Sequence, residues 1–202
     1  MHYHTGEYEE ARKLLESLAN TNSKYVEAFD WLAKVLEVQG KYVAAQKVLE
    51  AAVTQSAKSV QRQQALARLA ELNNDYDVMY KACRKAISLG KNSYFCNPHM
   101  YISLAKALQP KIKSGSMREQ KLCSTEAFGL LESARTEFDL DPLSAIKASL
   151  VEAQTLFNSG KQTEGKLAYR VAQTQLERSQ DLSLDDKLDV LIVRLSFDEE
   201  AT

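Results

Sequence analysis

The helical pattern of this sequence is clearest in FDWLAKVLEVQGKYVAAQKVLEAA, residues 29–52. On both sides of Gly40, apolar residues recur every three or four positions, which is the spacing of one helix face. Gly40 lies between the two runs, where a glycine permits the chain to reverse. The sequence therefore predicts a first helix that ends near Gln39 and a second helix from Tyr42 to Gln55, packed against each other.

The same pattern returns with a period of 34 residues, at Gly6-Glu7-Tyr8, Gly40-Lys41-Tyr42 and Asn74-Asp75-Tyr76. The positions that follow each tyrosine at helical spacing are mostly small or apolar: Ala11, Ala45 and Met79; Leu15, Leu49 and Cys83; Leu18, Ala52 and Ala86. Small residues let two helices approach closely, and the larger ones fill the groove between them. A repeated pair of helices predicts a stacked, all-α fold.

These residues resemble the tetratricopeptide repeat (TPR) family, whose units have this period and the same order of bulky, turn, tyrosine and small residues. The copy at Val26–Ser56 is the most complete, and Val60–Leu89 is a second copy in which Asn74 replaces the turn glycine. The resemblance implies a right-handed α-α superhelix, a TPR-like solenoid in which the first helix of each pair lines a concave wall.

Downstream the period drifts, but the units continue. We expect one domain over residues 1–202, with units at 1–23 (partial), 24–57, 58–93, 97–140 and 142–179, and a C-terminal capping helix at 183–197. Ala105 and Ala127 are 22 residues apart where Ala33 and Ala45 are 12 apart, so the fourth unit contains ten extra residues. We assign them to Lys111–Gln120, which we interpret as a basic, solvated loop.

The first unit is incomplete, because Gly6 already occupies the turn between two helices. Tyr8, Ala11, Leu15 and Leu18 are then expected to be exposed without a partner helix in this chain. We expect the sequence to be a fragment that lacks an N-terminal domain. The alternative is that another subunit covers this face, which would make the protein a homodimer.

Composition argues against several kinds of partner. The 202 residues include 26 Lys+Arg and 27 Asp+Glu, so a formal net charge of −1 gives no electrostatic reason to bind nucleic acid. No apolar stretch approaches the roughly 20 residues that span a bilayer. Cys83, Cys96 and Cys123 have neither disulfide nor zinc spacing, so we expect reduced thiols and a cytoplasmic protein that does not bind membranes.

The sequence contains no pattern typical of catalysis. A glycine-rich phosphate loop, a paired-histidine metal motif and a nucleophile elbow are all missing from it. His2 and His4 are expected to be solvated terminal side chains. We therefore expect no enzyme, no catalytic residue, no metal site and no cofactor.

The resemblance implies a partner-binding groove on the first helices. The groove-facing positions of the family correspond here to Glu27, Asp30, Lys34, Glu37, Gln61, Gln64, Arg68, Glu71, His99, Ile102, Lys106, Lys147, Leu150, Gln154 and Phe157. We expect a wall that is polar at one end and partly apolar at the other, since Ile102, Leu150 and Phe157 would otherwise be misplaced on a solvated face.

A narrower resemblance is to the C-terminal helical region of bacterial TPR-containing response regulators. It rests on Trp31–Leu36, Gln39–Tyr42, Ala44–Glu50, Ala52–Val53, Asn74–Asp77, Ala86–Ser93 and Leu104–Leu108. It implies a protein–protein interaction module that acts as the output region in two-component signalling. Two alternatives remain: a sensor that holds a peptide or small ligand near Ile102, Leu150 and Phe157, and a self-associating adaptor.

Overall fold

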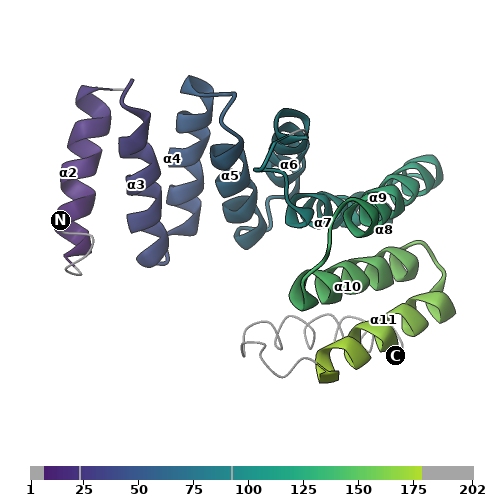
Figure 1. The fold of residues 1–202 in the computed structure, drawn as a ribbon. Coiled ribbons are helices and arrows are strands. Elements are labelled where there is room, and N and C mark those ends of the chain that lie inside the picture. The colour runs from purple at the N-terminus through teal and green to yellow at the C-terminus, as the bar shows by residue number, and fades with distance from the viewer. Residues whose placement is uncertain (1–6, 23, 92, 179–202) are drawn as a thin grey trace. The chain divides into compact units, whose positions relative to one another are not determined.

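The computed structural model describes residues 7–22, 24–91 and 93–178, and this part of the chain is helical without strands. The helices, coloured in chain order in Figure 1, are α2 (Tyr8–Thr21), α3 (Val26–Val38), α4 (Tyr42–Gln55), α5 (Val60–Leu72), α6 (Tyr76–Gly90), α7 (Pro98–Ala107), α8 (Gln109–Ser114), α9 (Met117–Glu137), α10 (Pro142–Asn158) and α11 (Gln162–Arg178). The predicted all-α, TPR-like solenoid fold is confirmed. The predicted capping helix at 183–197 lies outside the described residues.

Contacts divide the chain into two compact units, Met1–Cys96 and Asn97–Thr202. In the N-terminal unit α3 pairs with α4 and α5 pairs with α6, while in the C-terminal unit α7 pairs with α9 and α10 pairs with α11. Each unit is described by itself below. A single continuous superhelix over residues 1–202 stays a prediction.

In three of the turns between paired helices, the chain reverses at a residue with the left-handed backbone conformation. Gly40, Asn74 and Gly160 all have positive φ, at 72°, 55° and 84°. After Gly40, the backbone N–H of Lys41 donates to the carbonyl oxygen of Leu36 at 2.8 Å, which closes the end of α3. Asparagine is the residue other than glycine that tolerates this left-handed conformation best, which explains why Asn74 replaces the glycine.

The small and apolar repeat positions form the core of the N-terminal unit. Ala45, Leu49, Ala52, Cys83 and Ala86 are all buried. Burial of alanine at these positions keeps the helix axes close, as the 34-residue pattern predicts.

The expectation for the first half-unit is wrong for Ala11. This residue is buried, because α2 packs against α3. Tyr8 and Leu15 are partly buried, and Leu18 is exposed. That a preceding domain, or alternatively another subunit, covers α2 stays a prediction.

The interpretation of Lys111–Gln120 as a solvated loop is also wrong. Residues 109–114 form α8, and α9 already begins at Met117. Ser116 and Glu119 form a reciprocal capping box at the start of α9, which satisfies backbone donors at this helix end. The side chain of Ile112 is completely buried and anchors α8.

Candidate partner-binding cleft

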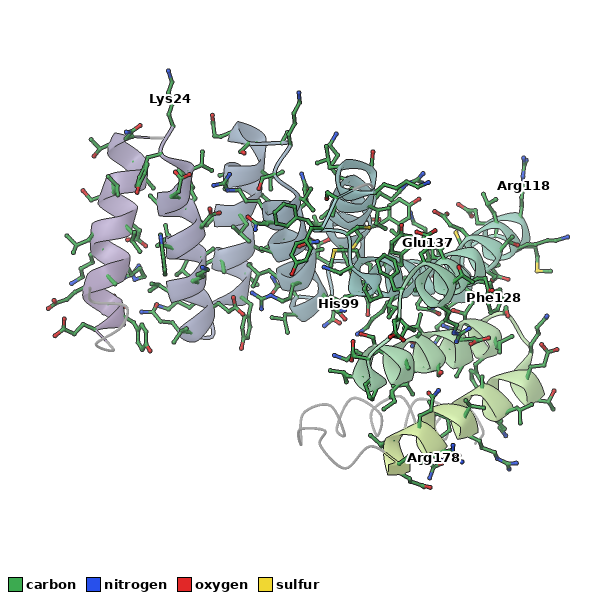
Figure 2. All side chains as sticks on the ribbon, in the orientation of Figure 1. Lys24, His99, Arg118, Phe128, Glu137 and Arg178 are labelled. Atoms are coloured by element: carbon green, nitrogen blue, oxygen red, sulfur yellow. The ribbon has the colours of Figure 1, made fainter. Side chains whose placement is uncertain are left out.

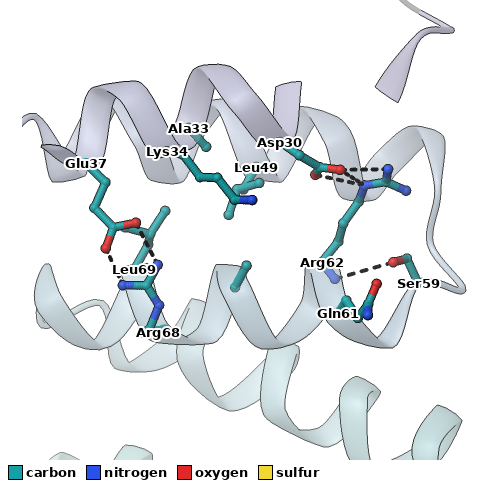
Figure 3. A pocket seen from close by; sticks show the side chains of 11 residues that line it. Asp30, Ala33, Lys34, Glu37, Leu49, Ser59, Gln61, Arg62, Arg68 and Leu69 are labelled. Atoms are coloured by element: carbon teal, nitrogen blue, oxygen red, sulfur yellow. Dashed lines mark hydrogen bonds and ion pairs between the residues drawn. The ribbon is translucent and has the colours of Figure 1, made fainter. Parts of the chain in front are cut away.

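A cleft of about 480 Å³ lies in the N-terminal unit between α3 and α5, the first helices of two successive pairs (Figure 3). Its lining residues are Asp30, Ala33, Lys34, Glu37, Leu49, Ser59, Gln61, Arg62, Ala65, Arg68 and Leu69. Asp30, Lys34, Glu37, Gln61 and Arg68 among them are groove positions implied by the resemblance. The structure therefore brings these five residues of the predicted set together.

One ion pair closes one end of the cleft. Arg62 of α5 donates from Nε to both carboxylate oxygens of Asp30 on α3, at 2.9 and 3.1 Å, and from Nη2 to Oδ2 at 2.8 Å. Its Nη1 donates to the hydroxyl of Ser56 at 3.0 Å. The hydrogen bond to Asp30 raises the pKa of the Arg62 guanidinium. This forked geometry holds both side chains in place.

A second ion pair lies at the other end. Arg68 of α5 contacts both carboxylate oxygens of Glu37, and Nη2 donates to Oε2 at 2.6 Å. The hydrogen bond from Arg68 lowers the pKa of the Glu37 carboxyl and outweighs the opposing effect of its partial burial. The two pairs thus join α3 to α5 at both ends of the cleft, as Figure 3 shows.

Lys34 reaches into the space between the two ion pairs (Figure 3). Its Nζ lies 4.5 Å from the centre of the Trp31 ring, one helical turn earlier on α3. A cation over an indole face is an attractive contact that also orients the lysine. Below it, Ala33, Leu49 and Leu69 supply an apolar floor. The cleft can therefore accept an apolar group on its floor and a negative group at Lys34.

We expect the ion pair between Glu37 and Arg68 to stabilise the folded state at neutral pH and to lose this effect in acid. Because the folded-state pKa of Glu37 is lowered, the contribution is complete above the unfolded value of about 4.3 and is lost as the pH falls through the folded value. Arg68 is about half exposed, so the contribution at neutral pH stays below about 1 kcal/mol. Urea midpoints of wild type and Glu37→Gln should differ at neutral pH and converge in acid. A difference that persists in acid would contradict this origin.

Two further members of the predicted set lie beside the cleft. Glu27 is exposed, with Oε1 3.7 Å from Nη2 of Arg62. Gln64 donates from its amide to the carbonyl oxygen of Phe95 at 2.7 Å, which ties α5 to the segment after α6. In the C-terminal unit Lys106, Lys147 and Gln154 are partly buried. That these residues share one groove with those of the cleft stays a prediction.

The prediction that three apolar residues line an open groove wall is wrong. Ile102, Leu150 and Phe157 are only 3%, 5% and 8% exposed, so they belong to the core. The reason is that α10 packs against α7, α8, α9 and α11 and has little open face left. Leu150 packs in a cluster with Ile146 and Ala172. These side chains therefore do not offer an apolar wall to a partner.

The structure adds candidate binding residues that the groove pattern of the family does not identify. Arg62 was not assigned to the groove, although its charge is opposite to that of Asp30, 32 residues earlier. Tyr94 and Phe95 form an edge-to-face pair with centroids 6.2 Å apart, and both rings are exposed. Two adjacent aromatic residues in a polar turn were the available signal, since exposed aromatic residues are enriched at interfaces.

Among the three cysteines, Cys83 is completely buried, with 0% of its side chain exposed. Burial raises the pKa of the Cys83 thiol to about 12, so it is not a poised nucleophile. Within residues 7–22, 24–91 and 93–178, no three acidic, histidine or cysteine side chains are grouped so that they could hold a metal ion. In the same ranges, no helix has both the length and the apolar character that crossing a membrane requires.

The N-terminal part of the chain is similar to a known family. Residues 2–69 match the family model described as tetratricopeptide repeat. No curated protein sequence matches.

Solved structures with the same fold include a MamA protein, at 14% identity, 91% coverage of both chains and a TM-score of 0.63. MamA 41-end from Desulfovibrio magneticus RS-1 has 15% identity, a TM-score of 0.63 and coverage of 90% of this chain and 92% of that one. A Podosopora anserina protein described as a kinesin light chain with nearly identical TPR-like repeats has 16% identity, a TM-score of 0.60 and the same coverage. At these identities the likeness shows the fold alone, and none of these matches indicates a catalytic family.

Proposed function

We propose that this protein is a protein–protein interaction module that binds a segment of its partner in the cleft between α3 and α5. The observation that carries the proposal is a cleft of about 480 Å³ with an apolar floor, bordered by an ion pair at each end. Three cations and two carboxylates line it, so its charge is mixed with a small positive excess. A short peptide with an apolar side chain next to a carboxylate fits this chemistry.

Preorganisation supports the proposal. Arg62 and Arg68 are already held by carboxylates, and Lys34 already lies over Trp31. Side chains that are ordered before binding lose less conformational freedom when the partner arrives. The charged rim then selects among peptides, while the floor supplies most of the buried apolar area.

The test is quantitative affinity capture from extracts of the source cells with the full chain and three variants. Lys34→Glu reverses the charge at the centre of the cleft, and Ala65→Phe fills the cleft from α5. Lys47→Glu is the matched control, because Lys47 is exposed on α4, outside the cleft lining. Circular dichroism checks that all variants keep their helicity.

We expect one or more proteins that wild type and Lys47→Glu retain equally and that Lys34→Glu and Ala65→Phe lose. The direct interaction is then measured with the purified candidate by calorimetry, where a loss of tenfold or more corresponds to about 1.4 kcal/mol. Capture that is unchanged by both cleft variants would refute the proposal.

We further propose the narrower role of output region in a bacterial two-component response regulator, with a cytoplasmic location. Its support is the sequence resemblance that centres on residues 31–53 and continues to residue 108. The intact mass of the protein in its source cells tests this role. A mass above 22.7 kDa with an N-terminal extension of receiver size supports it, and a mass of 22.7 kDa contradicts it.

A further inference from the structure

The region formed by α8 and the start of α9 carries a concentrated positive charge. Lys111, Lys113, Arg118 and Lys121 are all exposed within eleven residues. The same stretch contains one acidic residue, Glu119, whose carboxylate accepts hydrogen bonds from the backbone and hydroxyl of Ser116 at 3.0 and 2.6 Å. Because the whole chain has a net charge of −1, this local excess is a distinct feature of its surface.

Apolar side chains accompany these cations. Met117 is 84% exposed and Leu122 is 68% exposed, the two largest exposures of large non-aromatic apolar side chains among the described residues. Arg118, which lies between them in sequence, projects away from α9 in Figure 2. Exposed apolar groups next to cations are typical of a surface that another molecule covers.

The exposed stripe continues along α9 with helical spacing. Arg118, Leu122, Thr125 and Gly129 follow one another at steps of four, three and four residues, and all are exposed. A Cβ atom added at Gly129 would meet nothing within 4 Å, so no packing inside the chain requires a glycine there. Glycine is unfavourable in the middle of a helix, but it lets another backbone come close.

Met117, Arg118, Lys121 and Leu122 lie on the part of α9 that exceeds the repeat. This helix has 21 residues, whereas α4, α6 and α11 have 14, 15 and 17. The Ser116–Glu119 capping box and buried Cys123 keep the additional turns ordered. The cations and apolar side chains are therefore presented on a rigid helix, which suits a defined partner better than a disordered one.

We propose that this surface of α8 and α9, comprising Lys111, Lys113, Met117, Arg118, Lys121, Leu122, Thr125 and Gly129, is a second interaction surface that binds an acidic, amphipathic α-helix of a partner protein. Carboxylates of that helix pair with the four cations, and its apolar side chains cover Met117 and Leu122. Its backbone approaches α9 at Thr125 and Gly129. The small residues favour a protein helix over a lipid surface, because they allow close helix packing and would add little apolar area to a bilayer.

The test uses the full chain and a fluorescent synthetic peptide of about 20 residues, with a leucine stripe flanked by glutamates so that it forms an amphipathic helix. A permuted peptide of identical composition lacks the stripe. Fluorescence anisotropy at about 0.15 M salt measures binding. The disrupting variant is Arg118→Glu/Leu122→Glu, and the matched control is Val43→Glu/Lys47→Glu, an equally spaced and exposed pair on α4.

We expect the amphipathic peptide to bind wild type and the α4 control equally and the disrupting variant at least about tenfold more weakly. Gly129→Leu should keep or raise the thermal midpoint of the protein, because the new side chain meets nothing in the chain, yet weaken peptide binding. Reduced binding with retained stability separates a docking surface from a structural one.

Four results would overturn the proposal. They are absence of peptide binding, equal binding of the permuted peptide, equal binding by the disrupting variant, and unchanged binding by Gly129→Leu. Binding of the chain to phosphatidylserine vesicles that depends on Arg118 and Leu122 would assign the surface to membranes instead. Self-association of the full chain that the same double substitution abolishes, measured by sedimentation, would assign it to a second copy.

Discussion

Ile112→Asp is expected to destabilise the C-terminal unit by at least about 4 kcal/mol, because it places an unpaired carboxylate in a completely buried position. Ile112 is the anchor of α8, which packs against α7, α9 and α10. Urea denaturation followed by circular dichroism at neutral pH measures the loss. Much of this unit should be unfolded without denaturant.

Lys113→Asp provides the matched control for Ile112→Asp. It introduces the same side chain at the residue directly after Ile112, at an exposed position of α8. We expect its unfolding free energy to lie within about 0.5 kcal/mol of wild type, as for most surface substitutions. Equal losses in the two variants would contradict the burial of Ile112.

Leu69→Ala is expected to lower the unfolding free energy of the N-terminal unit by about 2–5 kcal/mol. Leu69 is 1% exposed, and its side chain lies under the cleft between α3 and α5. The substitution removes buried apolar contacts and leaves a cavity that the helices can only partly close. Because the cleft floor changes as well, partner binding should weaken in the fraction that remains folded.

Leu72→Ala is the control on the same helix, because Leu72 is half exposed. The unfolding free energy of this variant should be lower than that of wild type by only about 0.5 kcal/mol, and its partner binding should be unchanged. The measurement is the urea midpoint of each variant at the same pH and salt. If the Leu72 variant lost as much as the Leu69 variant, the proposed orientation of α5 would be refuted.

The helix pairs could be predicted because their signals are local. The predicted bounds of Tyr42–Gln55 coincide with α4, and the first helix ends at Val38, one residue before the predicted Gln39. Periodicity identifies such helices, and the positive φ at Gly40 follows from the freedom of glycine. Ile112 had no such signal, since a six-residue helix is too short for apolar periodicity.

The candidate cleft could be predicted only in part. The resemblance implied that Asp30, Lys34 and Arg68 share a surface, and the structure places all three in the cleft lining. The same transfer of family positions put Ile102 and Leu150 on an open wall, where the structure has them in the core. The groove positions of the family apply to the N-terminal unit, where the 34-residue period is regular. They do not apply after residue 97, because the additional helix α8 packs against α7 and α10 and changes which of their residues are buried.

The all-α fold, the paired helices and the turns at Gly40 and Asn74 follow from the sequence, because helical periodicity and backbone preference depend on residues close in the chain. The pairing of Arg62 with Asp30 and the burial of Phe157 became evident only from the packing of the helices. Those outcomes depend on which helix faces which, and hence on contacts between residues far apart in the sequence.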